Sequence, residues 1–290
     1  MRWQDSRRSS NVEDRRAGGG FSRMSMGRIG SLLPIIRFLL GSNIGRVVLG
    51  LGVVAYFMGY NPLALLDLDM SQTSSKAQIA QNEQENERFA FVSAVLAQTE
   101  DVWSKIFKDH GATYLEPNLV VFRDQVRSAC GFASSQSGPF YCPADHKVYL
   151  DLSFFDELAK VHKADGDFAQ AYVIAHEIGH HVQNLSGTLD RINKLKARSN
   201  NAIEQNALQV RVELQADCYA GIWAKHVNSR LEDGDINEAL NAASAIGDDT
   251  LQRKFQGHVV PDSFTHGSSK QRMEWFKKGF LSGKIEACAF

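Results

Sequence analysis

Apolar side chains recur with the 3.6-residue period of an α-helix between residues 168 and 182. The stripe that they form consists of Phe168, Ala171, Tyr172, Ala175, Ile178, Gly179 and Val182. Gly179 on this stripe would allow another helix to approach closely, because glycine has no side chain. A second long helical pattern covers residues 203–227. The second half of the chain is therefore predicted to hold two long helices.

Shorter patterns complete the predicted fold. Alternation of apolar and polar residues over 147–152 predicts a β-strand at the edge of a small antiparallel sheet, and residues 119–122 predict a second strand. Further helices are predicted over residues 83–109, 154–163, 238–255 and 268–282. With 290 residues and 43% hydrophobic content, the chain can bury one sizeable core. The predicted class is α+β and mainly helical.

The N-terminal region combines many arginines with a long apolar run. The run covers residues 47–66, contains no charged residue and is long enough to cross a bilayer. The arginines that precede it predict a cytoplasmic N-terminus. We therefore expect a cytoplasmic arginine-rich tail, one transmembrane helix, a polar linker and a folded domain, which cover residues 1–43, 44–66, 67–82 and 83–290 in that order.

This arrangement places the folded domain in the periplasm or outside the cell, anchored in the inner membrane by a single crossing. Two alternatives stay open at this point. Residues 32–40 could form an interfacial segment together with the apolar run, or a signal peptidase could cut after it. No clear small-x-small cleavage site follows the run, so retention of the anchor is favoured.

Charge and cysteine content narrow the picture further. The formal net charge of −1 gives no electrostatic footprint for nucleic acid. Four cysteines on the predicted outer side of the membrane could form two disulfides in an oxidising compartment. Three pairings are possible, and we favour Cys130–Cys142, across a Gly/Ser-rich loop, and Cys218–Cys288. A zinc site made of cysteines is disfavoured because no Cys-x-x-Cys pair exists.

The candidate chemistry lies on the first long helix. His176 and His180 are one turn apart, so their imidazole nitrogens can converge on one metal ion. Glu177 lies roughly 100° around the helix from His176. It is therefore a poor ligand of the same ion but is well placed as a general base for water. The alternative is a chance meeting of these residues on an amphipathic helix.

A catalytic zinc needs a third protein ligand. Gln183 and Ser186 stand where the metzincin class requires glycine and histidine, so that class is excluded. Glu213 is the better candidate, and Asp217 one turn later could accept a hydrogen bond from a ligand histidine. Without the two histidines, this acidic pair would be interpreted as a solvated helix face.

Several segments together resemble the bacterial YpfJ-like neutral zinc metallopeptidases. They are His-Glu-Ile-Gly-His-His-Val-Gln at 176–183, Glu-Leu-Gln-Ala-Asp-Cys at 213–218, Met-Arg-Trp at 1–3 and Asn-Val-Glu-Asp-Arg-Arg at 11–16. The histidine and glutamate motifs are also similar, more distantly, to thermolysin and the HtpX-type proteases, the gluzincin class. The resemblance implies a zincin-like peptidase domain, with His176, His180 and Glu213 as zinc ligands, Glu177 as base and Asp217 as the partner of His176.

Thr265-His266-Gly267 followed by Arg272 resembles the Thr-His-Pro and arginine element of the HtpX type, although Gly267 replaces the proline. His266 is therefore a candidate for stabilising the oxyanion of the reaction. The alternative is that His266 caps the helix that begins near Ser268 and that Arg272 makes a structural ion pair. The other histidines, His181 among them, receive no catalytic role, and His181 is expected to point away from the ligand face.

Three functions are compatible with these residues. The favoured one is hydrolysis of peptide or protein substrates by a single zinc ion, with the substrate held as an added strand on the edge predicted at 147–152. The second is a zinc amidase acting on cell-wall peptide, and the third is a catalytically silent envelope protein with structural zinc. An open coordination position would separate the first two from the third, because structural zinc is closed by four protein ligands.

Overall fold

The two long predicted helices pack against each other in the computed structural model, which describes residues 1–16 and 71–290. Helix α5 (Asp167–Leu185) and helix α7 (Ala202–His226) are both largely buried. Gly179 lies at their crossing, since a Cβ atom there would be 3.0 Å from the Cα and carbonyl oxygen of Ala216. The predicted close approach at Gly179 is thus confirmed, and it brings the two helices that carry the candidate residues together.

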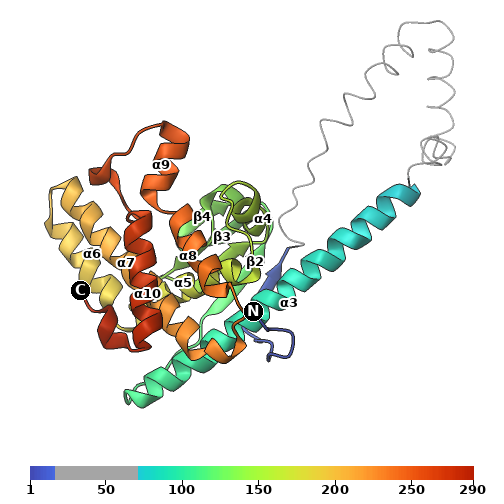
Figure 1. Ribbon diagram of the computed structural model, residues 1–290, viewed down its shortest axis with the longest axis horizontal. Helices are drawn as coiled ribbons and strands as arrows, with labels where there is room; N and C mark the ends of the chain where they lie inside the picture. Colours follow the sequence, from blue (N-terminus) through green and yellow to red (C-terminus); the bar gives the residue numbers. More distant parts are fainter. Residues whose placement is uncertain (17–70) are drawn as a thin grey trace, which may run out of the picture. The chain divides into compact units, whose positions relative to one another are not determined.

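Other helices surround this pair (Figure 1). Helix α10 (Ser269–Ser282) packs against α7 so closely that a Cβ on Gly279 would lie 1.9 Å from the carbonyl oxygen of Cys218. Helices α6 (Thr188–Arg198) and α8 (Asp235–Ala245) also pack against the pair. Helix α4 (Ser153–Lys160) follows β6 and comes before α5 in the sequence. Helix α3 (Ser71–Asp109) buries apolar side chains between Phe91 and Ile106 in the same core.

The single helix predicted over 238–255 is two helices, α8 and α9 (Asp248–Gln256). The chain leaves helical geometry at Gly247, where any Cβ would lie 2.5 Å from the backbone nitrogen of Ser269. Asp248 then accepts hydrogen bonds from the backbone N–H groups of residues 265–267. Contact with this distant loop, which periodicity does not reveal, is the reason for the break.

The main sheet has four strands in the order β1-β2-β6-β5. They are β1 (Val12–Arg15), β2 (Asn118–Phe122), β6 (Lys147–Asp151) and β5 (Phe140–Cys142). Strands β1, β2 and β6 run parallel, and only β5 among these four is antiparallel to its neighbour. The prediction of an antiparallel sheet was wrong for this sheet, although a separate hairpin, β3 (Gln125–Ser128) and β4 (Gly131–Ser134), is antiparallel.

The edge strand was also misplaced in the prediction. Strand β6, predicted at 147–152, pairs with β2 on one side and with β5 on the other, so it is an inner strand. Strands β5 and β1 are the two edges of this sheet, and β5 is the edge next to β6. Its three residues are too few to show alternation, which explains why the sequence pattern did not reveal it.

Residues 1–16 belong to the folded unit of residues 87–290 and are not a separate tail. Strand β1 pairs with β2, Trp3 packs edge-on against Phe91, and the α-amino group of Met1 lies 2.7 Å from the Asp167 carboxylate at the start of α5. The linker predicted over 67–82 also differs from the structure, because residues from Ser71 are helical. Residues 20–86 form the other unit, and the part of it that the structure describes is residues 71–86, the beginning of α3.

Pairing of β1 with β2 has a topological consequence. The two strands belong to one sheet, so they lie on the same side of any membrane. The predicted single crossing between a cytoplasmic N-terminus and an external domain is incompatible with this sheet. The predicted anchor itself, at 44–66, lies outside the described residues. Among the residues described, none of the helices is both sufficiently long and sufficiently apolar to span a bilayer.

Candidate metal centre

Helices α5 and α7 bring the three predicted ligands to one point. The Glu213 Oε2 atom lies 3.3 Å from His176 Nε2 and 3.5 Å from His180 Nε2. Glu213 and His176 are buried, and all three side chains line a cavity of about 570 Å³. The i and i+4 spacing on α5 and the contact with α7 at Gly179 together produce this convergence.

The distances from Glu213 to the two histidines fit a tetrahedral zinc ion. Zinc bonds of about 2.0–2.1 Å place neighbouring ligand atoms of a tetrahedron roughly 3.3–3.4 Å apart. The two distances to Glu213 agree with that spacing within about 0.2 Å. Two imidazole nitrogens and one carboxylate oxygen are also a donor set that zinc prefers. No other histidine, cysteine or carboxylate joins this cluster in the part of the chain that the structure describes.

Asp217 holds His176 as predicted. Its Oδ1 lies 2.8 Å from His176 Nδ1 and also accepts a 2.5 Å hydrogen bond from the Tyr172 hydroxyl. Arg272 donates to both Asp217 oxygens, each at 2.9 Å, and is itself buried. Because Asp217 occupies Nδ1, the Nε2 atom of His176 faces Glu213 and the cavity.

These contacts shift the pKa values of the metal-free site. Burial would raise the pKa of Asp217, but the charges of Arg272 and His176 lower it to about 2. Burial would lower the pKa of His176, but the charge and hydrogen bond of Asp217 raise it to about 9. Burial likewise opposes ionisation of Glu213, yet the two histidines hold its pKa well below the usual range. A metal ion that binds His176 would therefore displace a proton from its imidazole.

The other two ligands have partners that the sequence analysis did not predict. Gln183 Oε1 lies 2.9 Å from His180 Nδ1, and Gln209 Nε2 donates a 2.7 Å hydrogen bond to Glu213 Oε1. Each glutamine is three or four residues from its ligand on the same helix, a spacing that could have identified both. The sequence analysis considered Gln183 only as a residue that excludes metzincins.

Glu177 lines the same cavity and is only 8% exposed. Its carboxylate makes no hydrogen bond or ion pair with any residue that the structure describes, unlike the carboxylates of Glu213 and Asp217. A buried carboxylate beside the ligand cluster that no described side chain engages is suited to receive a proton from a molecule in the cavity.

His266 lines the cavity from the loop before α10, with its side chain 52% exposed. The Asp248 carboxylate lies 3.2 Å from His266 Nδ1, and this hydrogen bond raises the pKa of His266. His266 does not cap α10, because Ser268 is the capping residue and its hydroxyl accepts from the Gln271 backbone. Arg272 forms the ion pair that the alternative predicted: it pairs with Asp217, and both side chains are buried.

His181 points away from the ligands, as expected. Its Nδ1 lies 3.0 Å from the Tyr141 hydroxyl and its Nε2 lies 2.6 Å from the carbonyl oxygen of Leu115. Burial lowers the pKa of His181 to about 4, so the ring is neutral. Because Tyr141 belongs to β5, this contact fastens the edge strand to α5.

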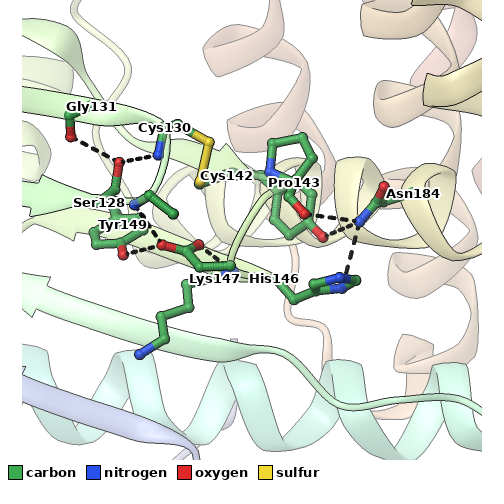
Figure 2. Close-up of a disulfide and its surroundings, with 12 residues drawn as sticks. Ser128, Cys130, Gly131, Cys142, Pro143, His146, Lys147, Tyr149 and Asn184 are labelled. Atoms are coloured by element: carbon green, nitrogen blue, oxygen red, sulfur yellow. Dashed lines mark hydrogen bonds between the residues drawn. A yellow bond between two sulfur atoms is a disulfide. The ribbon is translucent and has the colours of Figure 1, made fainter.

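The end of β5 is fixed by a second set of contacts. The Cys130–Cys142 disulfide joins it to the loop between β3 and β4, and Asn184 of α5 approaches Pro143 and His146 beside it (Figure 2). Asn184 also donates to the Tyr141 hydroxyl. Both favoured disulfide pairings, Cys130–Cys142 and Cys218–Cys288, are confirmed.

His176 and His180 of the His-Glu-x-x-His helix α5 lie beside Glu213 of α7, an arrangement similar to that of the gluzincin class, which the sequence motifs resemble. The chain belongs to the family described as "Putative neutral zinc metallopeptidase", whose profile matches residues 1–290. It is 49% identical to the uncharacterized protein YpfJ of Escherichia coli K12 over 99% of this chain and 98% of that protein. It is 40% identical to the uncharacterized protein Rv2575 of Mycobacterium tuberculosis over 68% of this chain and 70% of the relative. No solved structure matches the chain.

Proposed function

We propose that this protein is a zinc-dependent peptidase that binds one zinc ion per chain through His176, His180 and Glu213. The observation that carries the proposal is the convergence of these three ligand atoms in a cavity that Glu177 also lines. A structural zinc site would need a fourth protein ligand. The described residues offer three, which favours a catalytic role over a silent one.

In the proposed reaction, Glu177 acts as the general base. A bound zinc ion would supply a Lewis acid that polarises the scissile carbonyl and acidifies a water molecule. Glu177 accepts the proton of the attacking water on its carboxylate and passes it to the nitrogen of the leaving amine. The peptide bond is hydrolysed without a covalent bond between substrate and enzyme. Asp217 keeps His176 oriented throughout, because Arg272 and Tyr172 fix its carboxylate.

His266 is the residue that we propose to stabilise the oxyanion. It lines the cavity, its side chain is about half exposed, and Asp248 favours its charged form. A positively charged imidazole can donate a hydrogen bond to the negative oxygen that develops on the substrate carbonyl. Arg272 is unsuited to this role, because its guanidinium is buried against Asp217.

The substrate is proposed to add as a strand along β5. This strand is one of the two edge strands of the sheet, and its residues Phe140 and Tyr141 line the cavity that holds the ligands. An extended peptide at that edge would use backbone hydrogen bonds for affinity and neighbouring pockets for its side chains. The fastening of β5 to α5 through Tyr141 sets the distance between the bound strand and the catalytic residues.

We also propose that the folded unit works in an oxidising compartment, the periplasm or the cell exterior. Two disulfides support this assignment, because such bonds are rare in the reducing cytosol. Since β1 belongs to the main sheet, the proposal places residues 1–16 in the same compartment as residues 87–290.

The decisive test compares Glu177→Gln with Glu157→Gln, a matched change in another glutamate that lines the cavity. Both variants should keep one zinc ion per chain. Glu177→Gln should lower peptide hydrolysis by at least about 100-fold, the usual range for loss of a general base, whereas Glu157→Gln should stay near wild type. Full activity in Glu177→Gln would remove this residue from the mechanism. A library of peptides that includes cell-wall peptides, with and without chelator, identifies the substrate class.

A further inference from the structure

Two buried glutamines lie behind His180. Gln183 is fully buried on α5, and Gln215 is 5% exposed on α7. The Gln183 amide nitrogen lies 3.0 Å from Gln215 Oε1, so the two side chains join the helices through a hydrogen bond. Burying an amide costs free energy unless its hydrogen bonds are satisfied. The partners of these two amides therefore determine how each side chain is oriented.

The orientation of the Gln183 amide is determined by its surroundings. The amide approaches the backbone carbonyl oxygen of Val212 at 2.7 Å, and a carbonyl oxygen can only accept. The nitrogen of Gln183 must therefore face Val212, which leaves Oε1 facing His180 Nδ1 at 2.9 Å. An oxygen at that position requires a proton on Nδ1. In the neutral ring, His180 then has its lone pair on Nε2, the atom that faces Glu213.

The same reasoning applies to Gln215. Its nitrogen donates a 3.0 Å hydrogen bond to the backbone carbonyl oxygen of Cys288, so its oxygen must face Gln183. Cys288 is near the C-terminal end and is joined by a disulfide to Cys218 of α7. The pair of amides is thus oriented at both ends by backbone carbonyls, one on α7 and one on the C-terminal segment.

We propose that Gln183 and Gln215 are positioning residues of the metal centre: they hold His180 in the tautomer that presents Nε2 to the ion. The inference rests on the proposed zinc site. His176 is oriented by a carboxylate and an arginine, whereas His180 is oriented by neutral amides. The two ligand histidines on one helix therefore depend on separate and independent supports.

The experiment measures the zinc dissociation constant of the full-length protein by competition with a chromophoric chelator. Gln183→Met and Gln215→Met keep similar side-chain length and remove the amide. Gln98→Met is the matched control, because Gln98 is also 5% exposed but bonds to Ser6 away from the cavity. Gln183→Met should weaken zinc binding by about 10–100-fold, the usual effect of losing a partner of a ligand histidine. Gln215→Met should weaken it less, and Gln98→Met should not change it.

A second readout is independent of zinc. Nitrogen-15 NMR of the metal-free protein at alkaline pH reports which ring nitrogen of His180 carries the proton. The wild type should show the proton on Nδ1, and Gln183→Met should lose this preference. Wild-type zinc affinity in Gln183→Met, or an unchanged His180 tautomer in that variant, would overturn the proposal. If the wild type binds no zinc, the proposed metal site is refuted. The NMR measurement would then still show whether Gln183 determines the tautomer of His180.

Discussion

The burial of His181 predicts a pH-dependent loss of stability that can be isolated with one substitution. His181 is 1% exposed and neutral, with its Nε2–H directed at the Leu115 carbonyl. Its pKa falls from an ordinary value of 6.5 to about 4 in the folded protein. Each tenfold difference in proton affinity corresponds to about 1.4 kcal/mol, so this change corresponds to roughly 3 kcal/mol.

The sign follows from which state binds the proton first. As pH falls below 6.5, the unfolded chain protonates this histidine while the folded protein does not, so the free energy of unfolding decreases. The stabilising contribution is complete above pH 6.5 and is lost progressively as pH falls to about 4. His181→Gln retains a side-chain N–H near the Leu115 carbonyl but has no titrating group. Its free energy of unfolding should therefore not decrease for this reason as pH falls.

The assay is urea unfolding of the metal-free protein with its disulfides intact, followed by tryptophan fluorescence at several pH values. Other groups that bind protons at acidic pH are the same in wild type and variant, so their effects cancel in the difference between the two free energies of unfolding. The advantage of wild type over His181→Gln should shrink by about 3 kcal/mol between roughly pH 7 and pH 4. A difference that stays constant over this range would contradict the buried, neutral state of His181.

Two further predictions concern the architecture. Cys288→Ala opens a disulfide between residues 70 positions apart and should lower the free energy of unfolding by roughly 4 kcal/mol, as measured by urea unfolding; a loss below about 1 kcal/mol would count against the bond. Single cysteines introduced at Ser10 and at Asp233, both exposed, should be labelled together or protected together by a membrane-impermeant maleimide in intact cells. Labelling of one alone would contradict the pairing of β1 with β2.

Sequence periodicity predicted the two central helices, α5 and α7, and the candidate residues they carry, but it did not predict α6 or the break between α8 and α9. His176, Glu177 and His180 share one helix, and their relative positions follow from helix geometry alone. Glu213 required a second helix and the assumption that the two meet, which the close approach at Gly179 satisfies. Local spacing therefore predicted most of the candidate site.

The sheet could not be predicted in the same way, because its pairing is non-local. Strand β1 pairs in parallel with a strand more than 100 residues later, and nothing in residues 12–15 specifies that partner. The arginines around it suggested a tail, although Arg16 stacks on Phe89 and Lys147 pairs with Glu13. Charged residues at the edge of a sheet are compatible with a strand, and charge alone did not distinguish the two.

The most direct test of the account is the metal coordination of the purified full-length protein. The full chain is required, because removal of residues 1–16 would remove β1 from the sheet. Metal analysis with X-ray absorption should find one zinc ion per chain, with two imidazole nitrogens at about 2.0–2.1 Å and oxygen donors completing the shell. Glu213→Ala should weaken zinc binding markedly. Sulfur or four histidines around the metal, or wild-type zinc affinity in Glu213→Ala, would contradict the proposed site.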